Sequence, residues 1–185
     1  MNEYRVNLNY AKALMLVASD TDSVETVCAD MRLVYEVCAE NRELVVVLVN
    51  PCVKESAKLA IIGDIFGSHV SPLSLAFMNF LIRKKRTVNL KGIARTFIEL
   101  YREQRGIELC EIVTAKEVQP ELLDEVRQAV GQYTGKEVEL VSRVDNRMLG
   151  GYRLMFNNNM YDARLRTKIR KLRIAFSENI YESKL

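Results

Sequence analysis

The sequence has few of the residues on which most catalytic and metal sites depend. It contains no tryptophan, one histidine and three prolines in 185 residues, and its four cysteines lie far apart. No two cysteines have the Cys-x-x-Cys spacing of a metal or redox motif, so we expect free thiols. With His69 as the single histidine, a catalytic triad or a histidine metal site has no basis. We therefore expect no cofactor, no metal and no enzymatic activity.

Long apolar runs are also missing. The longest, residues 44–49, is far shorter than the roughly 20 residues that a membrane-spanning helix needs. The first residues do not show the basic segment followed by an apolar one that marks a secretory signal. We expect a protein that is made and kept in the cytoplasm.

Residues 1–105 carry apolar side chains at helical spacing, which predicts six short amphipathic helices packed as a bundle. Residues 44–49 are ambiguous because their β-branched side chains favour a strand. Their neighbours are all helical and offer no strand to pair with, so we predict a short buried helix there. The predicted spans are 3–19, 24–38, 44–49, 54–66, a helix that begins after Ser71, and 89–104.

The pattern changes after Arg105-Gly106 to that of a small α+β domain. Short β-rich or alternating segments predict strands at 107–114, 138–144, 152–156 and 160–161. A helix is predicted at 120–130 and should end at Gly131, and Asn157-Asn158-Asn159 should form a turn. We thus expect an α+β protein with an N-terminal six-helix bundle, residues 1–105, and a small C-terminal α+β domain, residues 106–185.

A last helix is predicted after Asp162, which should cap it. Its apolar side chains are spaced by four, three and four residues, so they form one stripe that should pack on the small sheet. These side chains are Leu165, Ile169, Leu172 and Phe176. The domain would then consist of a short sheet and a C-terminal helix.

The first and fifth helices each have a second apolar stripe. One interpretation is that both helices lie at the centre of the bundle. The other is that the second stripes line a groove that receives a partner helix. The residues alone do not separate these two interpretations.

Charge is unevenly distributed. Residues 106–162 contain 6 basic and 10 acidic side chains, whereas residues 163–185 contain 7 basic and 2 acidic ones. Such asymmetry is compatible with a solvated face or with a docking surface for an acidic partner. The basic run at residues 83–86 raises the alternative of a small nucleic-acid-binding or regulatory adaptor, although no aromatic stacking platform accompanies it.

Several motifs follow one another in a recognisable order. Residues 10–14 read YAKAL and residues 79–86 read NFLIRKKR. Further on, residues 134–140 read TGKEVEL, residues 144–151 read VDNRMLGG, and Met160-Tyr161-Asp162 leads into a basic segment. In order and spacing, the chain resembles the delta subunit of bacterial rotary ATP synthases, the oligomycin-sensitivity-conferring protein family, over nearly its whole length.

The resemblance implies a non-catalytic stator subunit at the cytoplasmic face of the inner membrane, held there only through the complex. The N-terminal bundle would bind the N-terminal helix of an alpha subunit in the catalytic head. The C-terminal domain would bind a b-type peripheral-stalk subunit, and no nucleic acid would be bound. The implied groove residues are Tyr10, Ala11, Leu14, Val17, Leu75, Met78, Asn79 and Ile82. The implied stalk-facing residues are Arg164, Lys168, Lys171 and Arg173.

The chain departs from the family pattern at three points. Asn146 stands where proline is usual, Met148-Leu149 replaces Leu-Ile, and Ala163-Arg164 replaces Gly-Ser. These changes affect the loop geometry expected near the stalk contact.

Overall fold

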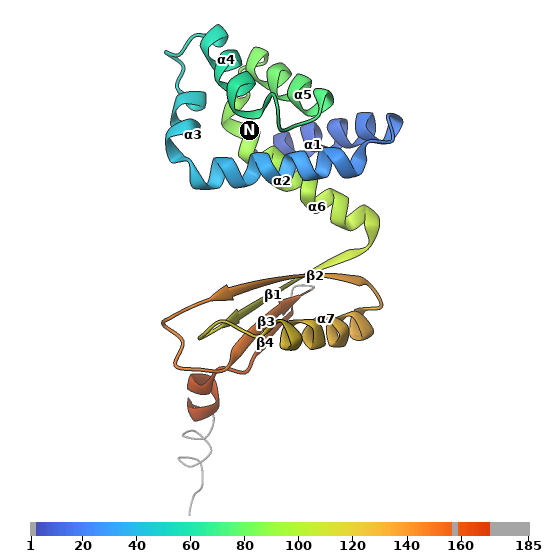
Figure 1. Ribbon diagram of the computed structural model, residues 1–185, viewed down its shortest axis with the longest axis vertical. Coiled ribbons are helices and arrows are strands. Elements are labelled where there is room, and N and C mark those ends of the chain that lie inside the picture. The colour runs from blue at the N-terminus through green and yellow to red at the C-terminus, as the bar shows by residue number, and fades with distance from the viewer. Residues whose placement is uncertain (1–2, 157–158, 171–185) are drawn as a thin grey trace, which may run out of the picture. The chain divides into compact units, whose positions relative to one another are not determined.

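The computed structural model describes residues 3–156 and 159–170 and divides the chain into two compact units, 1–104 and 105–185 (Figure 1). The protein is α+β, as predicted. The described part of the first unit consists of six α-helices and one 3₁₀ helix, η1. Their bounds are α1 Glu3–Asp20, α2 Val24–Glu40, α3 Arg42–Val49, α4 Glu55–Phe66, α5 Pro72–Arg83, η1 Thr87–Asn89 and α6 Leu90–Arg105.

The core of the first unit is apolar and is contributed by every α-helix. Its largest fully buried side chains include Met31 from α2, Phe66 from α4 and Phe97 from α6. Met31 and Phe97 lie on the apolar stripes that the 3.6-residue period defines in their helices. The predicted helix ends in this unit agree with the observed ones to within two residues.

The segment at residues 44–49 is helical, as predicted, but it is not buried as a whole. Within α3 only Leu48 is buried, and Val46 and Val49 are exposed. The carbonyl oxygen of Leu48 accepts hydrogen bonds from Lys58 Nζ at 2.6 Å and Thr87 Oγ1 at 2.7 Å. An eight-residue helix presents one face to the core, so Leu44 and Val45 pack partly against it while Val46 and Val49 stay exposed.

A buried carboxylate positions the start of α5. Asp30 of α2 accepts hydrogen bonds from the backbone N–H of Ser71 at 2.9 Å and from its hydroxyl at 2.6 Å. The Ser71 hydroxyl oxygen in turn accepts from the N–H of Ser74 at 3.3 Å, which caps the helix, and Pro72 occupies its first turn. These bonds tie α5 to α2 at one end.

The second unit is built on a four-stranded mixed sheet. Its elements are β1 Ile107–Thr114, α7 Pro120–Thr134, β2 Glu137–Val144, β3 Tyr152–Phe156 and β4 Asn159–Asp162. The strand order is β2-β1-β3-β4, with β1 and β2 parallel and the other neighbours antiparallel. The crossover helix α7 lies along one face (Figure 1), where Cys110, Val130 and Val138 form a small core.

Two predicted boundaries in this unit are wrong. Gly131 does not end α7, because the helix continues to Thr134 and ends where Gly135 adopts a left-handed φ of +67°. A glycine inside a helix weakens it without ending it, whereas a left-handed glycine does end it. Asn159 belongs to β4 and not to the preceding turn. The other two asparagines of the predicted turn lie outside the described residues.

The start of the last helix also differs from the prediction. The described helical residues are 165–170, and Arg164 O accepts the first helical hydrogen bond, from Lys168 N. Asp162 therefore does not occupy the capping position, although its carboxylate accepts the Arg164 N–H at 3.0 Å in the turn before the helix. Leu165 and Ile169 are exposed, so this part of the predicted stripe is not buried against the sheet. Leu172 and Phe176 lie outside the described residues.

Candidate partner-binding site

An apolar groove lies between α1 and α5, with a volume of about 420 Å³. Eight side chains from the two helices line it: Asn9, Tyr10, Ala13, Leu14, Val17, Leu73, Phe77 and Phe80. Seven of them are apolar or aromatic. Such a lining at a protein surface is typical of a site that binds the apolar face of a partner.

The groove has a buried floor and exposed walls. Leu14 is buried at the floor, while Val17 and Phe80 are 42% and 43% exposed on the two sides. The Tyr10 and Phe80 rings lie with their centroids 6.3 Å apart at 59°, which links α1 to α5. Lys84 Nζ lies 5.6 Å from the centroid of the Phe80 ring and places a cation at one end of the groove. The arrangement fits an amphipathic helix with an apolar stripe.

The structure places the predicted groove residues in three environments: the groove itself, the core, and half-buried positions outside the groove. Tyr10, Leu14 and Val17 line the groove. Met78, which is 1% exposed, and Ala11 and Ile82 are buried in the core. Leu75 and Asn79 are half-buried and do not line the groove.

On α5 the groove is lined by Leu73, Phe77 and Phe80, which the predicted set of groove residues did not include. The larger aromatic content of this stripe was a usable signal, because aromatic side chains are enriched at protein interfaces.

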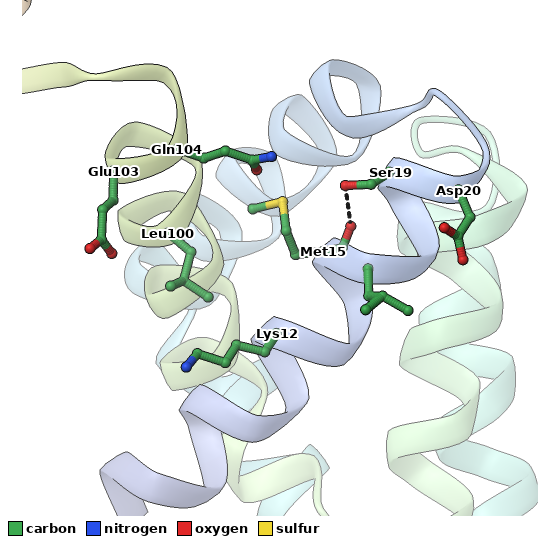
Figure 2. A pocket seen from close by; sticks show the side chains of 8 residues that line it. Lys12, Met15, Ser19, Asp20, Leu100, Glu103 and Gln104 are labelled. Carbon is green, nitrogen blue, oxygen red and sulfur yellow. Dashed lines mark hydrogen bonds between the residues drawn. The ribbon is translucent and has the colours of Figure 1, made fainter.

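A second hollow, of about 590 Å³, lies between α1 and α6 (Figure 2). Met15 of α1 and Gln104 of α6 point toward one another across it, and Leu100 lies beside them. Lys12, Asp20 and Glu103 also line it. Because charges of both signs surround a short apolar patch, this hollow fits an apolar helix stripe less well than the α1–α5 groove does.

The predicted basic surface is only partly described. Lys168 is exposed, and Lys171 and Arg173 lie outside the described residues. Arg164 is engaged within the chain: its guanidinium donates to both oxygens of Asp162, at 2.6 to 3.0 Å. These hydrogen bonds from Arg164 hold the pKa of the Asp162 carboxyl well below its usual range. Arg164 is thus paired within the chain, and its stalk-facing role stays a prediction.

The described residues hold no group of three or more histidine, cysteine or acidic side chains that could bind a metal ion. Burial, with a smaller contribution from Glu108, raises the pKa of the Cys110 thiol to about 11. Burial likewise raises the pKa of Cys38. Among the described helices, none is long and apolar enough to cross a membrane.

An apolar groove between two helices is a feature by which proteins bind amphipathic helices of their partners. A sequence profile of the ATP synthase delta (OSCP) subunit family matches residues 6–176. The chain belongs to this family, which confirms the resemblance seen in its motifs.

Individual relatives agree with this assignment. The chain is 32% identical over 164 residues to the ATP synthase subunit delta of Brevibacillus brevis, covering 89% of this chain and 94% of that one. It is 29% identical over 180 residues to the ATP synthase subunit delta of Cytophaga hutchinsonii, covering 97% and 98%. Among solved structures, a chain of the Toxoplasma gondii mitochondrial ATP synthase hexamer has the same fold, with a TM-score of 0.71 at 20% identity over 97% and 99% of the two chains.

Family membership establishes the general role. The chain is a stator subunit of an ATP synthase and is associated with the peripheral stalk. The hypothesis of a nucleic-acid-binding or regulatory adaptor has no comparable support from these relatives.

Proposed function

We propose that the first unit binds the N-terminal helix of an ATP synthase alpha subunit in the α1–α5 groove, and that the second unit binds a b-type peripheral-stalk subunit. The protein itself would catalyse nothing. It would hold the catalytic head still against rotor torque, so that ion flow is coupled to ATP synthesis. It would lie at the cytoplasmic face of the membrane, attached only through the complex.

The observation that carries this proposal is the α1–α5 groove. Its walls are formed by Tyr10 and Val17 on one side and Phe77 and Phe80 on the other, around the buried Leu14. Partly exposed aromatic side chains around an apolar floor are the kind of residues that dominate binding energy at interfaces. A stator needs a long-lived contact, and burying such side chains slows dissociation more than surface charges do.

The groove is tested by calorimetric titration of the full chain with a synthetic peptide of about the first 20 residues of the same organism's alpha subunit, long enough to span the groove as a helix. We expect one-to-one binding. Phe80→Asp and Val17→Asp should each weaken it by at least about tenfold, because each introduces a charge into an apolar contact. Both positions are exposed in the free protein, so the fold should persist.

The matched control is Leu16→Asp, on the same helix. Leu16 is exposed and lines the other hollow, between α1 and α6. Its substitution should leave the affinity within about twofold of the unchanged protein. Binding that is unaffected by Phe80→Asp but lost with Leu16→Asp would move the site to the other side of α1. If the affinity falls steeply as salt is added, ionic contacts of the kind that bind phosphate groups would dominate the interaction instead of the apolar groove.

A further inference from the structure

A third hollow of the first unit lies where the end of α3, the start of α4 and the segment between α5 and α6 meet. It has a volume of about 320 Å³ and shares no lining residue with the α1–α5 groove or the α1–α6 hollow. This volume is near the lower end of the roughly 300–1,000 Å³ that small-molecule sites occupy. Lys54, Lys58 and Lys85 are among the residues that line it, and we call it the lysine pocket.

The lysine pocket has a buried ammonium in its lining. Lys58 of α4 is 8% exposed, and its Nζ donates to the carbonyl oxygen of Leu48, which also accepts from Thr87 Oγ1. An ammonium has three N–H donors, so the bond to Leu48 uses one of them. The carbonyl end of α3 offsets the charge of Lys58 only in part, because a helix end carries about half an elementary charge. Lys58 therefore keeps both positive charge and donors for a further acceptor.

Two more lysines stand at the rim of the pocket. Lys54 and Lys85 are exposed, and both line it. Glu55 is the acidic side chain among the described residues that line the pocket, so three lysines against one glutamate leave a net charge of +2. In the part of the chain that the structure describes, no carboxylate forms an ion pair with any of these three lysines. The described chain thus leaves this positive charge without a counter-charge.

The backbone at the start of α4 adds to the positive field of the lysines. Lys54 is the N-cap residue of α4, and its side chain makes no capping hydrogen bond. The first N–H groups of a helix have no partner within the helix, and the positive end of the helix dipole lies there. Groups of this kind bind anions at helix N-termini, so the backbone and the lysines favour the same kind of ligand.

Lys85 adopts a backbone conformation that lysine seldom takes. Its φ is +56°, in the left-handed region where glycine or asparagine is usual after a helix. Such outliers are concentrated at functional sites, where the side chain is needed despite the strain. The turn also divides the basic run at residues 83–86, because Lys84 lies over the Phe80 ring at the α1–α5 groove while Lys85 lines the lysine pocket.

We propose that the lysine pocket binds a phosphate group, either as the free ion or as part of a small organic phosphate such as a nucleotide. A phosphate group carries about two negative charges near neutral pH, which matches the net charge of the pocket, and its oxygens accept hydrogen bonds from ammonium groups. The pocket takes no part in the proposed function, since neither the α1–α5 groove nor the second unit contributes a lining residue.

A phosphate bound there would link segments that lie far apart in the sequence. Lys54 and Lys58 belong to the start of α4, whereas Lys85 follows α5. Because only the folded chain brings these lysines to one pocket, the ligand binds the folded form and not the unfolded one. Phosphate should therefore raise the unfolding temperature of the protein in a saturable way.

The test is titration of the full chain with sodium phosphate at about pH 7.5, where the dianion predominates. The unfolding temperature and calorimetry report binding, and sodium chloride at equal ionic strength corrects for general screening. A second titration uses ADP without a divalent cation in place of phosphate, so that the free ion and the organic phosphate are distinguished.

Variants of the rim should change the affinity in opposite directions. Lys54→Gln and Lys85→Gln should each weaken phosphate binding by about three- to fivefold, because each removes one exposed charge. Glu55→Gln should strengthen it by a similar factor, because it removes the carboxylate that repels phosphate. The same change takes an acidic side chain from the first turn of α4 and should slightly lower the stability of the free protein. Opposite signs for binding and stability separate recognition from an effect on the fold.

The matched control is Lys12→Gln. Lys12 is an exposed lysine of the same unit, but it lies on α1 and lines the α1–α6 hollow. Its substitution removes the same charge from the protein as a whole, so it measures the effect of net charge alone. The affinity for phosphate should stay within about twofold of the unchanged protein.

Each outcome decides the matter. Saturable binding of phosphate that both rim variants weaken supports the free ion as the ligand, and binding of ADP alone with the same dependence assigns the pocket to an organic phosphate. If neither ligand has an effect beyond that of sodium chloride, the inference is wrong. It is also wrong if Lys54→Gln and Lys85→Gln bind as well as the unchanged protein. None of these results bears on the α1–α5 groove, which the alpha-subunit peptide tests.

Discussion

Gly151 is the residue at which the backbone is most constrained. Its φ is +83°, and a Cβ atom there would meet the carbonyl oxygen of Ala163 and lie 2.9 Å from the Cα of Arg164. The backbone of residues 163–165 runs close to this turn, since Leu165 N donates to Gly150 O at 3.0 Å. Only glycine allows this approach without strain.

Gly151→Ala should therefore lower the free energy of unfolding by more than about 1 kcal/mol, through backbone strain and the clash with Ala163. The control is Gly63→Ala in α4, where the added methyl group meets nothing within 4 Å. That change should raise stability by up to about 1 kcal/mol, because alanine favours a helix interior. Urea unfolding of both variants measures the two effects, and equal destabilisation would contradict the argument for Gly151.

The four cysteines should differ in their reactivity toward a thiol reagent. Cys28, Cys38 and Cys110 are buried, and Cys52 is exposed. Burial raises the pKa of Cys38, and raises that of Cys110 to about 11, so little thiolate is present near neutral pH. We expect one thiol to react rapidly in the native protein at pH 8. Cys52→Ser should abolish this rapid phase, and a rapid phase that survives would mean that a buried thiol is accessible.

At the scale of elements, both ends of α5 are fixed by hydrogen bonds, in addition to the packing of its buried side chains. Asp30 accepts both the N–H and the hydroxyl of Ser71 at the start of α5. At the other end, Lys85 adopts a left-handed φ of +56° and Arg86 N donates to Leu81 O at 2.9 Å, which ends the helix. Because α5 forms one wall of the groove, these ends set the position of that wall.

Asp30→Ala should lower the free energy of unfolding by about 1–3 kcal/mol, since it removes the buried acceptor of two half-buried donors. Glu36→Ala, an exposed acidic position on the same helix, should change it by no more than about 0.5 kcal/mol. Chemical denaturation of both variants provides the comparison. Similar small effects in the two would show that Ser71 finds another acceptor.

The molecule as a whole consists of two units that each have a core. The core of the first unit includes Ile93 and Phe97 of α6, so α6 belongs to this unit. The core of the second unit is much smaller and contains Cys110, Val130 and Val138. A small core implies a low stability for that unit when it is isolated.

A fragment of residues 1–105 should fold alone and melt cooperatively, because it contains every helix of the first core. A fragment of residues 1–89 should not, because it lacks the buried side chains of α6. Circular dichroism of the two fragments tests this. A disordered spectrum for residues 1–105 would contradict the independence of the first unit.

The sequence by itself determined which segments are helices and strands and where the fold changes character. Periodicity placed α1 and α6, and β-rich composition gave β1 its observed ends at Ile107 and Thr114. These features are local, so the residues within each segment are sufficient to specify them. The order of the motifs was sufficient to identify the family.

Only the tertiary structure decided which face of each element is used. On α5 both stripes are apolar, and Met78 became core while Phe80 became a groove wall because of what packs against each of them. Likewise, no local signal indicated that β1 pairs in parallel with β2 or which face of the sheet α7 covers. An apolar side chain has the same propensity whether its neighbour is this chain or a partner, so only the packing of distant segments separates core from binding surface.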